Sequence, residues 1–157
     1  MENKEILIAE LKKVLNGGTA HVGLKDAVAG LPFNLLSEKP HQLPYSIWQL
    51  VEHIRIAQWD MLEFSKDGNH KSPKWPDEYW PEDPAPKNEN DWKNCLKQIE
   101  DNLNEFIKLI ESKDVFENIA NGSGQNILRE ALQIADHNAY HIAEIIVIRR
   151  LLNAWKS

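Results

Sequence analysis

The sequence predicts an all-α fold, a four-helix bundle. Four long segments carry apolar residues at alternating spacings of three and four, which is the pattern of amphipathic helices. Strand-like alternation never extends beyond a few residues, and two long proline-containing connections separate the helices. The chain has 157 residues, of which 42% are hydrophobic, so we expect one domain, residues 1–157, with an adequate core.

The first helix is predicted over residues 4–16. Its apolar residues recur on one face: Leu7, Leu11, Val14 and Leu15. The pair Gly17-Gly18 is expected to end it, because glycine favours helix C-termini. Residues 17–45 then form a long connection, in which three prolines leave room for one short helical turn at about residues 24–29.

The second helix is predicted over residues 46–66. Pro44 cannot continue a helix from upstream, Ser46 is a suitable N-cap, and Gly68 closes the far end. The inward stripe consists of Leu50, His53, Ala57, Met61 and Phe64. One histidine, His53, is therefore expected to point into the bundle.

The connection that follows, residues 67–90, is predicted to cross the bundle. It holds five of the eight prolines, which excludes an interior helix or a central strand. A chain of this length reaches roughly 80 Å when extended, whereas the flanking helices are ~30 Å long. The second and third helices are therefore predicted to be parallel, joined by a long crossover.

The crossover also contains aromatic residues, Trp75, Tyr79 and Trp80, within the loop 73–86. Such side chains bury much apolar area when they find a surface. They either fold back to cover the bundle or wall a substrate pocket. Packing is the favoured interpretation, because aromatic residues serve it more often than they contact ligands.

The third and fourth helices are predicted over residues 91–112 and 126–154. The third has the clearest stripe: Trp92, Leu96, Ile99, Leu103, Phe106 and Ile110. The fourth begins after the breaker run 121–124, with Asn126 as N-cap. Its inward residues are Ile127, Ile134, Ile145, Ile148 and Leu152, and His137 and His141 fall on the same side.

The histidines are the chemically most informative residues. His137 and His141 are four apart, so on a helix both imidazoles face one way and can reach one ion. With His53 from a neighbouring helix, three nitrogen ligands converge and a position stays open for water or substrate. The alternative is three core histidines that are hydrogen-bonded without any metal.

Ligand type does not identify the ion. Three nitrogens suit zinc or nickel, and also iron, manganese or copper. Asp60 lies seven residues after His53 and Glu144 three after His141, so each is a candidate to orient an imidazole or to act as a base. The simpler interpretation of both acids is a solvated helix flank.

We expect no chemical role for the remaining three histidines or for the single cysteine. His21, His41 and His70 lie in predicted loops and are expected at the surface. Cys95 lies near the stripe of the third helix and is expected to pack in the core. Because it is alone, neither an intrachain disulfide nor a cysteine metal cluster can form.

Charge and hydropathy exclude two classes of partner. A formal charge of -6 argues against a nucleic-acid partner, which needs a concentrated basic surface. The longest apolar stretch, residues 145–148, is far short of the ~20 residues that cross a bilayer. Because the N-terminus also lacks a signal-peptide pattern, we expect a cytoplasmic protein.

The chain contains three informative runs: Pro44-Tyr45-Ser46-Ile47-Trp48-Gln49-Leu50-Val51-Glu52-His53-Ile54, Asp136-His137-Asn138-Ala139-Tyr140-His141 and Arg149-Arg150-Leu151-Leu152. Together they resemble the DinB-like (DinB/YfiT) superfamily of bacterial proteins. The likeness covers nearly the whole chain, including the helix order and the crossover. Where family members often have Gly-Gln, this chain has Ala143-Glu144.

The resemblance implies an up-down-down-up bundle and a divalent ion on His53, His137 and His141. It also implies frequent homodimers and, for some members, metal-dependent transfer of a low-molecular-weight thiol, or hydrolase or isomerase chemistry. The expected function is therefore a metal-dependent enzyme that activates a water or a thiol toward a small-molecule substrate. The alternatives are a non-enzymatic metal- or ligand-binding bundle and a metal-free interaction module.

Overall fold

Four long helices dominate the part of the chain that the computed structural model describes, residues 2–17 and 20–155. The helices are α1 (Glu2–Leu15), α3 (Ile47–Lys66), α4 (Glu89–Ser112) and α5 (Ile127–Leu151), with a short α2 (Leu24–Val28) after the first. Single 3₁₀ turns occur at Phe33–Leu35, Pro40–Gln42 and Asp77–Tyr79. The all-α prediction is confirmed. Across the described ranges, every helix is too short or too polar to cross a membrane.

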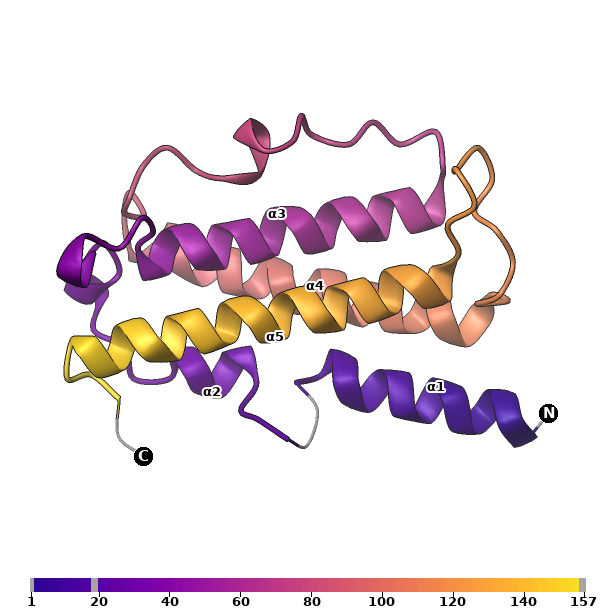
Figure 1. Cartoon of the computed structure of the whole chain (residues 1–157), viewed down its shortest axis with the longest axis horizontal. Helices are drawn as coiled ribbons and strands as arrows, with labels where there is room; N and C mark the ends of the chain where they lie inside the picture. Colours follow the sequence, from indigo (N-terminus) through magenta and orange to yellow (C-terminus); the bar gives the residue numbers. More distant parts are fainter. Residues whose placement is uncertain (1, 18–19, 156–157) are drawn as a thin grey trace.

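The helix directions follow the predicted up-down-down-up order. Figure 1 shows α1 and α5 running one way along the bundle and α3 and α4 running the other way. The chain returns from the end of α3 to the start of α4 outside the bundle, as the proline-rich crossover predicted. Helix α3 packs against both α4 and α5, and α1 packs against α5 and α4.

The helix ends follow the capping rules. Ser46 and Gln49 form a capping box at the start of α3, and Asn126 accepts a hydrogen bond from the Arg129 backbone N–H at 2.9 Å. Helix α4 begins at Glu89, two residues earlier than predicted, because Asn88 serves as its N-cap. At the end of α1, Gly17 has a φ of 101°, whereas the predicted partner Gly18 lies outside the described residues.

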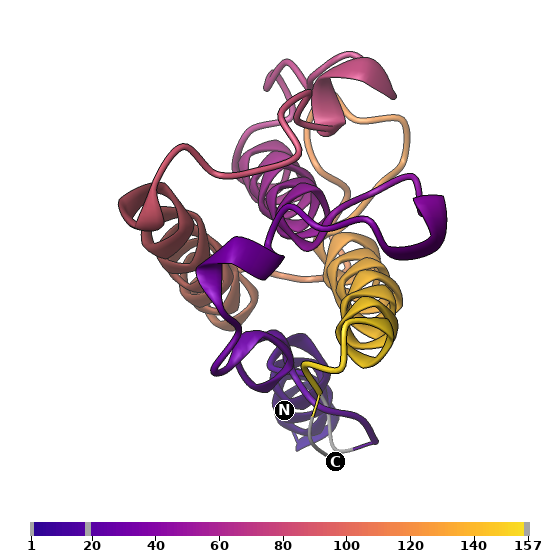
Figure 2. The same ribbon diagram turned by 90° about the vertical axis from the view of Figure 1, so that its left-hand side faces the viewer.

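Two helices share the first of the four helix positions in the bundle. Helix α1 packs along one half of the length of the bundle, and α2 packs along the other half (Figures 1 and 2). Arg149 of α5 holds α2 in place, because its Nη1 donates a hydrogen bond of 2.6 Å to the Ala27 carbonyl. The short turn predicted near residues 24–29 is therefore a structural replacement for half of a bundle helix.

The core consists of two apolar clusters with polar residues between them. One cluster joins α2 to the first halves of α3 and α4 and the second half of α5. The other joins α1 to the remaining halves. Between them, Gln58 donates to the Ile99 carbonyl at 2.7 Å and accepts from Asn138 at 2.8 Å. The histidines lie at this level of the bundle.

Candidate metal centre

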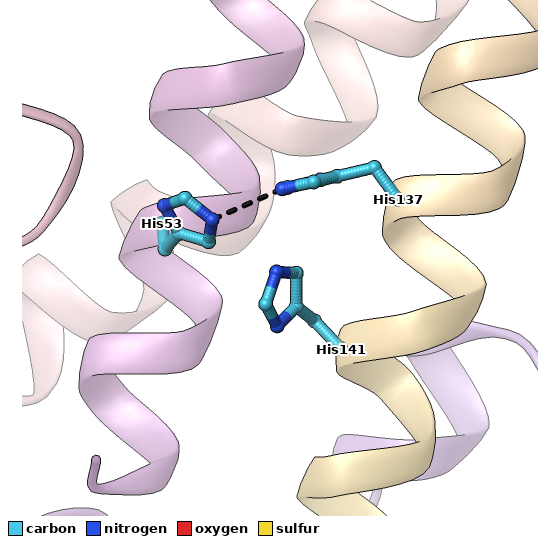
Figure 3. Close-up of side chains that lie close together, drawn as sticks. All are labelled: His53, His137 and His141. Atoms are coloured by element: carbon cyan, nitrogen blue, oxygen red, sulfur yellow. Dashed lines mark hydrogen bonds between the residues drawn. The ribbon is translucent and has the colours of Figure 1, made fainter. Parts of the chain in front are cut away.

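Helices α3 and α5 bring the three predicted histidines together. His53 comes from α3, and His137 and His141 come from successive turns of α5 (Figure 3). His53 is 2% exposed and His141 is 6% exposed, while His137 is partly buried. One ring nitrogen from each residue lies within 4.8 Å of the others. This geometry matches the convergence expected from the spacing of His137 and His141.

Hydrogen bonds to the outer nitrogens orient two of the rings. His53 Nδ1 donates to the Tyr79 carbonyl at 2.9 Å, and His141 Nδ1 donates to the Glu144 carboxylate at 2.7 Å. A ring nitrogen that donates in this way fixes the tautomer and leaves Nε2 as a lone-pair donor. Such outer partners accompany nearly all metal-bound histidines.

His137 is held differently. Its Nε2 lies 3.0 Å from His53 Nε2 (Figure 3). Because the His53 Nε2 is already an acceptor, the proton of this hydrogen bond belongs to His137. The His137 Nδ1 and the neighbouring Asn138 Oδ1 are both buried without a hydrogen-bond partner.

The unpaired His137 Nδ1 and Asn138 Oδ1 are explained if a cation binds between the imidazoles. If a cation replaced the proton between His53 and His137, His137 would protonate at Nδ1, which then becomes a donor beside the unpaired Asn138 oxygen. Nitrogens bound to one zinc ion at about 2.0–2.1 Å are roughly 3.3–4.2 Å apart, so ring movements on the order of 1 Å bring all three into bonding distance. The residues present therefore fit a three-nitrogen ion site.

The rings are neutral at neutral pH. Burial lowers the pKa of His53, and burial together with the other two rings lowers the pKa of His137 to about 4. Burial and the neighbouring His53 lower the pKa of His141 to about 4 as well. Neutral imidazoles keep their lone pairs available, which is the form that binds metals.

Aromatic side chains enclose this cluster. Trp80 stacks on His53, with ring centroids 3.8 Å apart and an interplanar angle of 8°. Tyr45 stacks on the other face of Trp80, and Tyr140 packs edge-on against His141. Trp75, in contrast, is 67% exposed. Two of the loop aromatics, Tyr79 and Trp80, therefore cover the bundle as favoured, and Trp80 at the same time borders the histidines.

The two acids named from the sequence have different surroundings. Glu144 contacts His141 directly, as described above. Asp60 contacts none of the three imidazoles; it accepts hydrogen bonds from the Tyr79 hydroxyl at 2.6 Å and from His70 Nε2 at 2.9 Å. Burial raises the pKa of Glu144, which favours its neutral form relative to an exposed glutamate.

One loop histidine departs from expectation. His70 was expected at the surface, but its side chain is only 15% exposed because the chain turns back after α3 and brings it to Asp60. His21 and His41 are exposed, as expected. Cys95 is buried in the core, and burial raises the pKa of its thiol, so it is not an activated nucleophile.

Two hollows of about 540 and 510 Å³ lie elsewhere on the molecule. Both are lined by Arg55 and Gln98, on the side of α3 that faces α4. None of the three histidines lines either hollow. The chemistry-bearing residues and these two surface depressions are therefore separate features, and the histidines rather than the hollows define the candidate site.

One of three comparisons with known proteins identifies a family that agrees with the all-α fold. A family model described as the DinB superfamily matches residues 21–145, which include α2 to α5 up to Ile145 and all three histidines. The search of curated proteins returned no match. The search of solved structures likewise returned none. Because the family model covers well over half of the sequence, this chain belongs to the DinB superfamily.

Proposed function

We propose that the chain binds one divalent cation on His53, His137 and His141 and is a metal-dependent enzyme. The observation that carries the proposal is the meeting of three neutral imidazoles from two helices, two of them oriented by outer hydrogen bonds. A ligand set of three nitrogens is also the set that leaves a coordination position for catalysis. Zinc or nickel suits it best, with iron or manganese as alternatives.

The proposed chemistry is activation of a water or a small thiol for transfer or hydrolysis. When bound, the cation supplies Lewis acidity and lowers the pKa of such a group at its open position. The chain supplies the orientation: Tyr79 and Glu144 fix the rings of His53 and His141. Glu144 is also partly exposed beside the cluster, and its raised pKa suits a group that takes up and returns a proton.

Elemental analysis of protein purified without a histidine tag tests the site. We expect about one ion per chain, and we expect His137→Ala to lose it, because two nitrogens hold such an ion weakly. His21→Ala is the matched control, since His21 is exposed and far along the chain from the cluster. Unchanged metal content in His137→Ala, with circular dichroism showing intact helices, would contradict the assignment.

A non-enzymatic metal- or ligand-binding bundle is the second candidate. It is favoured by the Trp80 ring, which covers one face of His53, and by the separation of both surface hollows from the histidines. In that case the ion stabilises the fold. A large fall in melting temperature on chelation, without turnover of thiol or ester substrates by the loaded protein, would support this candidate over the enzyme.

A further inference from the structure

The crossover between α3 and α4 is tied to α3 along most of its length. We call residues 70–84 the strap. Besides the bonds of His70 and Tyr79 to Asp60, the Pro81 carbonyl accepts from Gln49 Nε2 at 2.9 Å and the Pro84 carbonyl accepts from Ser46 Oγ at 2.6 Å. A proline-rich loop without strand partners is thereby docked by side chains of one helix.

Tyr79 connects this docking to the ion site. Its hydroxyl donates to Asp60, while its carbonyl accepts the proton of His53 Nδ1. The next residue, Trp80, stacks on the His53 ring. Two adjacent strap residues therefore contact His53, and one of them, Tyr79, is also bonded to Asp60 through its hydroxyl.

The surroundings of Asp60 suit it to hold the strap in place rather than to act as a base. It is 8% exposed, and each of its two carboxylate oxygens already accepts one hydrogen bond. The hydrogen bond from the Tyr79 hydroxyl to Asp60 is 2.6 Å long and both residues are buried, so water does not compete for it. Of the two hydrogen-bond partners of Asp60, His70 and Tyr79, only Tyr79 is bonded to one of the three imidazoles.

We propose that Asp60 is a positioning residue of the ion site, acting through Tyr79: the Asp60–Tyr79–His53 chain of hydrogen bonds couples docking of the strap to binding of the cation. This rests on the proposed function. The Tyr79 carbonyl keeps the His53 proton on Nδ1, so Nε2 faces the cation. Coupling is reciprocal, so the bound cation also stabilises the docked strap.

Tyr79→Phe is the sharpest test, because it removes the hydroxyl and keeps the ring and the carbonyl. Tyr45→Phe is the matched control, since Tyr45 belongs to the same aromatic stack. Zinc affinity is measured by chelator competition. We expect Tyr79→Phe to weaken it about tenfold or more, because without the hydroxyl anchor the Tyr79 carbonyl no longer holds His53 Nδ1, its outer partner, in place. Asp60→Ala is expected to do the same, because it leaves the Tyr79 hydroxyl without its acceptor, and Tyr45→Phe is expected to have no effect.

Two further readouts separate positioning from general stability. Nitrogen-15 NMR of the zinc-free protein reports the His53 tautomer, which we expect to be Nδ1–H in the wild type and mixed in Tyr79→Phe. Trypsin cleavage after the exposed Lys71 and Lys74 of the strap is expected to slow when zinc binds the wild type, and to slow much less in Tyr79→Phe.

The outcomes distinguish this inference from the proposed function. If the wild type binds zinc and Tyr79→Phe keeps the same affinity, tautomer and cleavage protection, the coupling is wrong and the ion site stands. If the wild type itself binds neither zinc nor the other candidate metals, both are overturned. A weaker affinity with an altered His53 tautomer supports the coupling.

Discussion

His137 differs from the other two histidines in its surroundings. Its Nδ1 has no hydrogen-bond partner, whereas His53 and His141 each donate to an oxygen. The spacing of His137 and His141 was readable from the sequence, because a helix places residues four apart on one face. The Tyr79 carbonyl was not readable, because every residue has a carbonyl and only the path of the loop brings this one to His53.

The low pKa values of the histidines predict a pH-dependent stability of the metal-free protein. An unfolded histidine takes up a proton near pH 6.5, but in the fold His137 and His141 do so only at about pH 4. The unfolded state therefore binds more protons between these values, and the fold loses stability as the pH falls from about 6.5 to 4.

The expected loss is at most about 3 kcal/mol for each of the two rings. Urea unfolding of the metal-free protein at a series of pH values measures it. His141→Asn is expected to flatten part of the slope, whereas His41→Asn, at an exposed histidine, is expected to leave the slope unchanged. A free energy of unfolding that stays constant from pH 6.5 to 4 would show that the rings are not buried as described.

The long helices and the short turn of α2 were predictable from the sequence, whereas the position of α2 in the bundle was not. The regular stripe of α4 and the N-caps Ser46 and Asn126 depend on local sequence, so the helices and the starts of α3 and α5 were correctly predicted, whereas α4 begins two residues before its predicted start. The place of α2 beside α1 depends on the long-range bond from Arg149 to Ala27. The same limit explains His70, whose burial depends on Asp60, ten residues away.

Arg149 connects α5 to two neighbouring segments. It is buried, and its guanidinium donates to the Ala27 and Ala154 carbonyls, thereby holding α2 and the segment after α5. We expect Arg149→Ala to cost about 2–3 kcal/mol, because buried carbonyls lose charged donors. Hydrogen exchange should accelerate in α2 more than in α4.

Lys108 of α4 supplies the control. It is exposed, so Lys108→Ala is expected to change the free energy of unfolding by less than about 0.5 kcal/mol. Equal effects of the two substitutions, measured by chemical unfolding, would show that Arg149 does not anchor α2.

Within residues 2–17 and 20–155, no element covers the outer face of α5. The exposed residues Asp136, Tyr140, Ala143, Val147 and Arg150 follow one another at steps of four and three. Tyr140 is 64% exposed and Val147 is 50% exposed. Two large apolar side chains with this exposure on the same stripe are unusual. This stripe borders the ion site, because Tyr140 packs against His141.

We propose that a second copy of the chain covers this stripe, consistent with the homodimer expected from the resemblance. Asp136 and Arg150 lie seven residues on either side of Ala143. In an antiparallel pair of α5 helices centred on Ala143, Asp136 of each copy lies opposite Arg150 of the other, so the charges are complementary under two-fold symmetry.

Light scattering coupled to gel filtration tests the dimer. We expect a mass of twice 18.1 kDa for the wild type and a monomer for Arg150→Asp, which places like charges opposite each other. Adding Asp136→Arg to that variant should restore the dimer. Lys108→Glu, an exposed charge reversal on α4, is the control and should remain dimeric. A monomeric wild type would remove this interface.

The most direct measurement of the central claim is a crystal structure of the metal-loaded protein with anomalous data collected at the absorption edge of the ion. We expect one anomalous peak between α3 and α5, about 2.0–2.1 Å from a nitrogen of each of the three imidazoles if the ion is zinc. A peak bound by other residues, or rings of His53, His137 and His141 without a shared ion in fully loaded protein, would contradict the proposed site.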